Sequence, residues 1–207
     1  MLRILTIDDH EIVRDGIKGL FGASSARFGE ARSGPEGLAM VREQDWDIVV
    51  LDLSLGGRSG LDVLKEIKQL RPKLPVLILS MHAEEQYAMR AFKGGASGYI
   101  SKSSARDELR SVILKVIKGG RYVSPSLAEK MVFDLTTSDR PVHETLSDRE
   151  LEVLCLIASG KTVGEIAAKL SLSDKTISTY RRRILNKMVM KNNAELTHYG
   201  IRNGLVD

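Results

Sequence analysis

The sequence predicts a doubly wound α/β domain on a parallel sheet, followed by a smaller all-α domain. Three observations lead to this fold class. Short β-branched runs alternate with helical spacing over residues 1–120, the alternation stops over 121–145, and from Leu146 onward the pattern is helical alone. A chain of 207 residues, 43% of them hydrophobic, is long enough for two small domains. We therefore expect domains at 1–120 and 146–207, joined by a linker at 121–145.

Five strand–helix pairs account for the first domain. The strand-like runs are LRILTI, RFGEARS, DIVVLDL, LPVLILS and SGYIS. The stretches between and after them repeat apolar residues at helical spacing, as in Leu109, Val112 and Val116. Five such pairs in succession imply a parallel sheet with helices on both faces. The second strand, residues 27–33, has the weakest pattern, so we expect it at an edge.

The linker and the second domain carry helix signals of their own. The linker includes a candidate short helix at 125–135. Two segments have the spacing of a capping box, Ser147–Glu150 and Thr162–Glu165, and Gly160 is a helix stop between them. A last helix is expected over Asn193–Asn203. Together with a long helix starting near residue 174, this makes a four-helix domain.

Composition and charge narrow the class of protein. The chain has a single cysteine, Cys155, which excludes an internal disulfide and fits a reducing compartment. Cys155 lies on the apolar face of its predicted helix, so we expect a small buried side chain rather than a reactive thiol. The first ten residues do not resemble a signal peptide, and no apolar run reaches the roughly 20 residues that span a bilayer. We expect a cytoplasmic protein. Net charge is +2 over 1–120, −1 over 121–145 and +3 over 146–207, so the last domain is modestly the most basic.

Polar residues gather at the ends of the predicted strands. The first strand ends in Asp8 and Asp9, the third in Asp52 and the fourth in Ser80, and Lys102 follows the fifth. Ligands of an open doubly wound sheet bind beyond the carboxyl ends of its strands. We therefore expect these side chains to share one rim.

Crowded carboxylates repel one another, which raises pKa values unless a cation is bound. Mg²⁺ prefers such oxygen ligands and leaves room for a phosphate oxygen. Asp52 is then a nucleophile toward an activated phosphoryl group, with Lys102 and Ser80 holding the phosphoryl oxygens. Taken singly, the acids could be helix caps or turn residues, and Ser80 and Lys102 ordinary loop residues. The four histidines are scattered along the chain and suggest no metal cluster.

The helix beginning near Asp174 has two faces. Ile177, Ile184 and Met188 recur on one, and the other is a polar stripe of Lys175, Ser178, Thr179, Arg182 and Asn186. A turn of about three residues separates it from the helix 162–170, as in a helix-turn-helix. Ser178, Thr179 and Arg182 suit contacts to bases, and Lys175, Thr176 and Arg183 suit phosphates. The alternative is a solvated basic face.

These motifs resemble a response regulator of the NarL/FixJ type, with a receiver domain followed by a LuxR-type helix-turn-helix. IDDH, VVLDLSL, LILSMH and GASGYISKS carry the first part, and LSDRELEVLCLIASG, GEIAAKLSLSDKTIS and NAELTHYGIRNGL the second. The resemblance implies the strand order 2-1-3-4-5. It also implies Asp52 as phosphoacceptor, Asp8, Asp9 and Asp52 as Mg²⁺ ligands, Lys102 as the phosphate-pairing lysine, Ser80 as the switch hydroxyl and Tyr99 as the switch aromatic. Tyr99 could instead be a packing residue.

The resemblance implies a function as well. A sensor histidine kinase would donate the phosphoryl group, and the protein would bind promoter DNA as a dimer to regulate transcription, with RNA polymerase as a candidate partner. The protein would not be an enzyme beyond its own phosphorylation. Leu196, Tyr199 and Gly200 of the last helix would pair two DNA-binding domains, or else pack against their own domain.

Departures from the family pattern keep rival hypotheses in view. Gly56–Gly57 replaces a usual proline–glycine, which predicts a more mobile loop and leaves open a regulator that works without phosphate. Tyr180 stands where histidine is common. Val189 replaces a helix-ending glycine, so we expect the helix to end differently or run longer. A haloacid-dehalogenase-like phosphohydrolase is disfavoured, because Ser54 occupies the position of its second aspartate.

Overall fold

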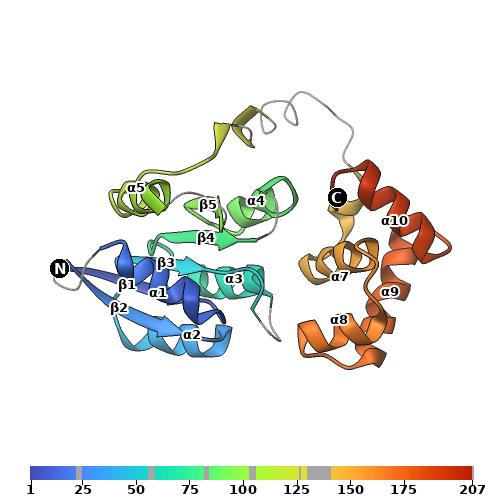
Figure 1. Cartoon of the computed structure of the whole chain (residues 1–207), viewed down its shortest axis with the longest axis horizontal. Helices are drawn as coiled ribbons and strands as arrows, with labels where there is room; N and C mark the ends of the chain where they lie inside the picture. The colour runs from blue at the N-terminus through green and yellow to red at the C-terminus, as the bar shows by residue number, and fades with distance from the viewer. Residues whose placement is uncertain are drawn as a thin grey trace. The chain divides into compact units, whose positions relative to one another are not determined.

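A computed structural model of the chain describes residues 1–21, 25–55, 59–81, 84–102, 106–125, 127–129 and 141–206. The chain divides into two compact units, Met1–Val132 and Phe133–Asp207. The division falls inside the expected linker, while the exact domain bounds at 120 and 146 stay predictions. Figure 1 follows both units along the chain by colour.

The first unit is an α/β sandwich around a five-stranded parallel sheet (Figure 1). Its strands are β1 (Leu2–Ile7), β2 (Ala26–Ala31), β3 (Ile48–Leu51), β4 (Val76–Ser80) and β5 (Gly98–Ser101). Its helices are α1 (Glu11–Gly19), α2 (Gly34–Glu43), α3 (Gly60–Leu70), α4 (Glu84–Lys93) and α5 (Arg106–Ile117). The order β2-β1-β3-β4-β5 confirms the expected fold class and the edge position of the second strand.

Burial explains why the central strands read as continuous apolar runs. All residues of β3 and β4 are buried, whereas β2 alternates buried and more exposed residues, as an edge strand does. One face of the sheet packs against α1 and α5 through residues such as Ile17 and Ile113. The strand residues between those of this cluster are also fully buried, so both faces are covered.

The segment after α5 pairs with the outer edge of the sheet. Tyr122 forms an isolated parallel bridge with Gly98, and its N–H donates to the Ser97 carbonyl at 3.1 Å. The Tyr122 hydroxyl donates to Glu108 Oε1 at 2.6 Å. Of the short helix expected at 125–135, residues 125 and 127–129 are helical; the remainder lies outside the described residues.

The second unit is helical throughout its described part. It contains a 3₁₀ turn, η1 (Val142–Thr145), and the helices α7 (Asp148–Ala158), α8 (Val163–Leu170), α9 (Asp174–Met188) and α10 (Asn193–Arg202). Packing of α7 against α8, α9 and α10 builds its core. Among the described helices of the chain, none combines the length and apolar composition that crossing a bilayer requires.

Helix ends in this unit follow the sequence signals closely. Both predicted capping boxes form, at Ser147–Glu150 and at Thr162–Glu165. Gly160, with φ of +80°, follows the end of α7. Three residues separate α8 from α9, and the Ser173 hydroxyl accepts from the Thr176 N–H at 3.2 Å. These local interactions fix where each helix begins.

The expectation for Val189 was wrong. We expected a β-branched residue to avoid a left-handed conformation and so to lengthen or alter the end of the helix. Instead α9 stops at Met188, and Val189 adopts φ 56° and ψ 43°. The Met190 N–H then bonds to the Leu185 carbonyl at 2.9 Å, which satisfies the helix end as a glycine would. The gain in hydrogen bonding outweighs the steric cost at an exposed residue.

Candidate functional site

Strand register brings two buried carboxylates together at one rim of the sheet. Ile7 pairs with Leu51 in the parallel ladder of β1 and β3, so the residues that follow them, Asp8 and Asp52, emerge side by side. Both are 1% exposed. The turn after β3 is tight: a Cβ on Gly60 would lie 2.4 Å from the Asp52 carbonyl oxygen, so only glycine lets α3 start this close to the acid.

Lys102 links the two acids. It follows β5, and its N–H donates to the Ser80 carbonyl at 2.8 Å, which extends the ladder by one residue. Its Nζ lies 2.7 Å from Asp52 Oδ2 and 2.7 Å from Asp8 Oδ2. The first contact is a hydrogen bond; the second has the length of an ion pair without hydrogen-bond geometry. The predicted meeting of these three residues at the rim is present.

Burial and ion pairing act against each other in this cluster. Desolvation raises the pKa of Asp52 above its ordinary value, against the hydrogen bond and charge of Lys102, and repulsion from Asp8 adds a smaller rise. We expected a raised pKa from crowding, but removal from water is the larger cause. Burial also opposes the charged form of Lys102, yet its pairing with the Asp52 and Asp8 carboxylates outweighs burial and raises the pKa of the lysine.

A group of possible metal ligands lies at the same rim. Ligand atoms of Asp8, Asp9, His10 and Asp52 all lie within 4.8 Å of one another. Asp8 Oδ2 is buried and lies 2.7 Å from the Lys102 ammonium group, so a metal ion at this rim would share the oxygen with Lys102. The donor set is rich in carboxylates and therefore fits a hard cation such as Mg²⁺.

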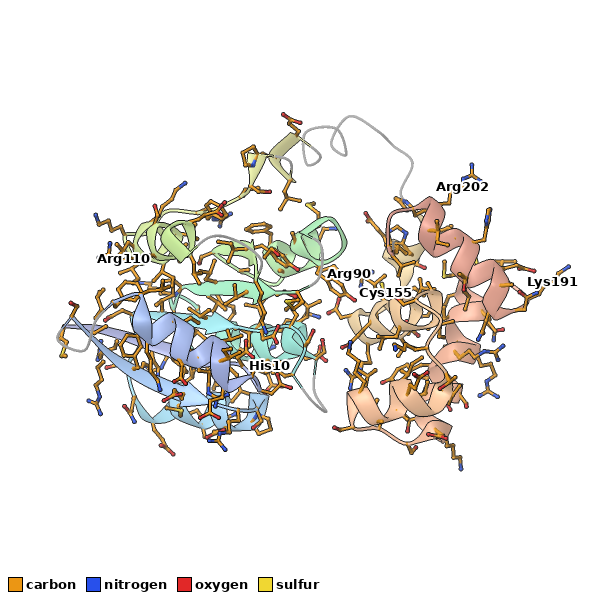
Figure 2. All side chains as sticks on the ribbon, in the orientation of Figure 1. His10, Arg90, Arg110, Cys155, Lys191 and Arg202 are labelled. Atoms are coloured by element: carbon orange, nitrogen blue, oxygen red, sulfur yellow. The ribbon has the colours of Figure 1, made fainter. Side chains whose placement is uncertain are left out.

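The sequence analysis did not assign His10 to this group. The His10 N–H donates to Asp8 Oδ1 at 2.8 Å, and its ring Nδ1 lies 2.8 Å from Asp9 Oδ1. Figure 2 labels His10 just after β1. The same ring nitrogen lies 3.2 Å from Asp8 Oδ1, so it contacts both aspartates. The four histidines lie far apart in the chain, so their spacing gave no sign of a metal site. The signal for His10 was its position directly after Asp8 and Asp9.

The two expected switch residues lie on neighbouring strands. Ser80 ends β4 and is fully buried, and Tyr99 in β5 is also fully buried. The ladder pairs Ile78 with Tyr99 and Ser80 with Ser101. Tyr99 therefore sits two residues below the rim, packed inside the unit. The structure brings Asp8, Asp52 and Lys102 into contact and sets Ser80 at the same strand ends.

A second candidate site is the polar face of α9. Ile177, Ile184 and Met188 are buried, as the apolar stripe predicts. On the other face the side chains are exposed or half-buried; they are Lys175, Thr176, Ser178, Thr179, Arg182, Arg183 and Asn186. The Thr179 hydroxyl donates to the Lys175 carbonyl at 2.9 Å. The stripe is therefore a continuous polar surface along α9, in which the hydroxyl hydrogen of Thr179 is bonded to the helix itself.

Tyr180 belongs to this surface, although the offsets of the stripe left it out. Ser173, Lys175, Thr176, Thr179, Tyr180 and Arg183 line a shallow concavity of about 330 Å³ near the start of α9. Tyr180 lies one turn after Thr176 and one turn before Arg183, so it bridges two residues expected to contact phosphates.

The residues predicted to pair two DNA-binding domains face inward. Leu196 is fully buried, and a Cβ on Gly200 would lie 2.7 Å from Ala158 Cβ of α7. The Tyr199 hydroxyl contacts His143 Nδ1 at 2.9 Å, and the two rings meet edge to face. These contacts support the packing alternative that the sequence left open.

Comparison with known proteins identifies the two parts of the chain. The family described as "Response regulator receiver domain" matches residues 4–114, more than half of the chain. The family "Bacterial regulatory proteins, luxR family" matches residues 144–200. The chain belongs to the response regulators. It joins a receiver domain to a LuxR-type DNA-binding domain and is a transcription regulator rather than a phosphohydrolase.

Relatives match this response regulator along nearly its whole length. Response regulator UvrY of Escherichia coli (strain K12) is 33% identical over 99% of this chain and 96% of its own. Response regulator GacA of Pseudomonas protegens is 34% identical over 100% of this chain and 99% of its own. A solved structure of RcsB from Salmonella enterica serovar Typhimurium, bound to promoter rprA with the phosphomimetic BeF₃⁻, is 26% identical. It covers 96% of this chain and 97% of its own, with a TM-score of 0.63.

Proposed function

We propose that Asp52 accepts a phosphoryl group from the phosphohistidine of a sensor kinase and that this controls DNA binding. One observation supports this above the rest. Lys102 Nζ lies 2.7 Å from a buried oxygen of Asp52 and of Asp8, which places a cation beside the nucleophile. In the transfer, an Asp52 oxygen forms a bond to phosphorus as the nitrogen–phosphorus bond of the donor breaks.

Asp8, Asp9 and Asp52 would hold Mg²⁺ in this proposal, with His10 in contact with Asp8 and Asp9. The ion would neutralise charge on the phosphoryl oxygens. When Asp52 becomes an acyl phosphate its carboxylate loses its charge, and the Lys102 ammonium group would then pair with the phosphoryl oxygens. The Ser80 hydroxyl would rotate toward the phosphoryl oxygens at the same rim. The Tyr99 side chain, on the adjacent strand, would rotate as well. This is the switch that the family resemblance implies.

The polar face of α9 would contact promoter DNA. In this proposal Ser178, Thr179 and Arg182 would contact base edges. The DNA backbone would be contacted by the flanking residues Lys175, Thr176, Arg183 and Asn186. Tyr180, which lines the concavity, would join this set. RcsB in complex with promoter DNA provides the precedent for this assignment.

We further propose that two copies pair when phosphorylated or bound to DNA. Because Leu196 and Gly200 pack inward, contacts through α10 would use its outward face, where Ala194, His198 and Ile201 are exposed. Ile201 is 55% exposed, high for a large apolar side chain. The cytoplasmic location and a contact to RNA polymerase remain parts of this proposal.

Intact mass after incubation with Mg²⁺ and acetyl phosphate tests the phosphoryl step. The wild type should gain one phosphoryl group, and Asp52→Asn should gain none. DNA that the wild type selects from a random pool should then bind more tightly after phosphorylation in the wild type only. Gain of a phosphoryl group in both proteins, or equal affinity before and after, would refute the proposal.

A further inference from the structure

Arg14 is a buried arginine that the mechanism above does not use. It lies in α1, and its side chain is 3% exposed, while arginines are rarely buried without partners. Removing a guanidinium group from water is costly unless hydrogen bonds and an opposite charge compensate. The contacts of this side chain therefore indicate what its burial achieves.

Those contacts lead to the acidic rim. Arg14 Nη1 donates to the main-chain carbonyl of Asp8 at 2.8 Å. Its Nε donates to Glu30 Oε2 at 3.3 Å, and the other oxygen of Glu30 lies 2.6 Å from Lys18 Nζ. Glu30 thus holds the guanidinium from β2, and the guanidinium holds the backbone of a residue in the acidic cluster.

Fixing the Asp8 carbonyl fixes the direction of both aspartates. The peptide between Asp8 and Asp9 is planar, so its oxygen cannot turn without rotating the Asp9 N–H and Cα. The other end of Asp8 is already held, because its N–H donates to the Ala31 carbonyl at 3.0 Å. With Arg14 in place, the residue is held at its N–H, its carbonyl and, through the His10 N–H, its carboxylate.

We infer that Arg14 is a positioning residue for cation binding at the rim, acting through the Asp8–Asp9 peptide. The inference rests on the proposed function, since it concerns the same Mg²⁺ site. Arg14 touches neither the ion nor the phosphoryl group. It presents the Asp8 and Asp9 carboxylates together, and without it the entropic cost of assembling them would fall on each binding event.

The sign of the effect separates positioning from simple charge. A guanidinium near the site repels Mg²⁺, so its removal would tighten cation binding if through-space charge were its whole contribution. If Arg14 positions the ligands, its removal weakens cation binding despite the lost repulsion. The two explanations predict opposite changes in the same measured constant.

The experiment compares Mg²⁺ dissociation constants of the full chain by calorimetry for the wild type and Arg14→Met. We expect affinity about tenfold weaker in the variant, in the range seen for residues that orient metal ligands. With acetyl phosphate, the Mg²⁺ concentration for half-maximal phosphorylation should rise while the limiting rate changes less. Arg3→Met is the matched control: Arg3 pairs with Asp47 at the opposite end of β1, and its loss should leave Mg²⁺ affinity unchanged.

Each outcome decides one question. Mg²⁺ affinity of Arg14→Met equal to or tighter than that of the wild type overturns the inference. If that variant does not fold, Arg14→Lys and Glu30→Gln replace it; weaker binding in both supports positioning, and wild-type affinity in both overturns it. Failure of the wild type itself to bind Mg²⁺ or gain a phosphoryl group refutes the proposed function instead.

Discussion

The acidic rim of the first unit and the polar face of α9 keep their functional side chains in opposite environments. At the rim, Asp8, Asp52 and Ser80 are almost completely buried. On α9, Ser178, Arg182 and Asn186 are exposed. A phosphoryl group is small and can be enclosed, whereas a DNA duplex must be met by an outer surface.

This difference predicts how function and stability separate. A buried carboxylate loses its hydration when the chain folds, so the rim should oppose folding. An exposed arginine keeps its water and should contribute little to folding. Removing residues from the rim should therefore change stability, and removing them from the α9 face should change binding alone. Substitutions that remove functional groups from natural active sites commonly raise stability while function is lost.

The largest effect is expected at Arg182. Arg182→Ala should weaken binding to the selected DNA by about 1–3 kcal/mol, roughly 5- to 150-fold, because a bidentate base contact or a phosphate contact is lost. Fluorescence anisotropy at fixed salt measures this, and hydrogen exchange of the α7–α10 amides should be unaltered. Arg202→Ala, an exposed charge on α10, is the control. A loss of amide protection in Arg182→Ala would contradict the expectation that residues of the α9 face affect binding alone.

Glu150 sharpens the comparison, because it is a buried carboxylate in the second unit. It is 3% exposed, and Oε2 accepts from Ser147 N–H at 2.8 Å and from Lys187 Nζ at 2.6 Å. Burial opposes its charge, but the bonds to Lys187 and Ser147 outweigh burial and lower the pKa of Glu150. Glu150→Gln should cost about 1–2 kcal/mol at neutral pH, since Lys187 is half-exposed and its pairing is partly screened.

The pH dependence of this loss of stability follows from the direction of the pKa shift of Glu150. A lowered pKa contributes stability above the ordinary value of 4.5, and the contribution disappears as pH falls through the lower folded value. The difference between wild type and Glu150→Gln, read from hydrogen exchange of α7 and α9, should therefore shrink on acidification. A difference that does not depend on pH would mean that the charge contributes nothing.

A smaller effect of opposite sign is expected at the rim. Asp52→Asn should raise the free energy of unfolding of the metal-free first unit by about 1 kcal/mol, as substitutions that relieve a strained site commonly do. Burial raises the pKa of Asp52, so the wild type loses stability as pH rises from the ordinary 3.8 through the raised folded value. The variant should lack this decline. Trp46, the single tryptophan, reports unfolding of this unit in denaturant; a less stable variant at neutral pH would contradict the account.

Val189 should give the smallest change. It is 88% exposed, so Val189→Gly loses almost no packing while it relieves a left-handed β-branched residue. The relief of about 1–2 kcal/mol is partly offset by the entropy of glycine, which leaves about 0.5–1 kcal/mol of stabilisation. Slower amide exchange at the end of α9 would confirm it. Unchanged exchange would mean that the local backbone already accommodates valine.

Much of the fold could be predicted because its signals are local. Both capping boxes, Gly160 and the three-residue turn before α9 depend on neighbours within a few positions. The rim could also be predicted, because parallel strands deliver their last residues to one edge. The altered loop at Gly56–Gly57 lies outside the described residues and stays a prediction.

Other features depend on contacts that the sequence does not encode locally. The sequence carries no local signal for the burial of Arg14, which follows from Glu30 on a neighbouring strand and from the Asp8 carbonyl. The inward packing of Gly200 depends on Ala158, about 40 positions earlier in the chain. At Val189, propensity correctly indicated strain, but the hydrogen bonds that end the helix prevailed.

The bridge between Tyr122 and Gly98 has a practical consequence for anyone who isolates the first unit. An unpaired strand edge is a template for aggregation, and Tyr122 covers part of the β5 edge with its own backbone. A fragment cut at residue 114, where the receiver family match ends, would lose this cover and the pairing of Tyr122 with Glu108. A fragment extended through residue 125 would keep both, and should remain monodisperse at concentrations where the shorter one self-associates.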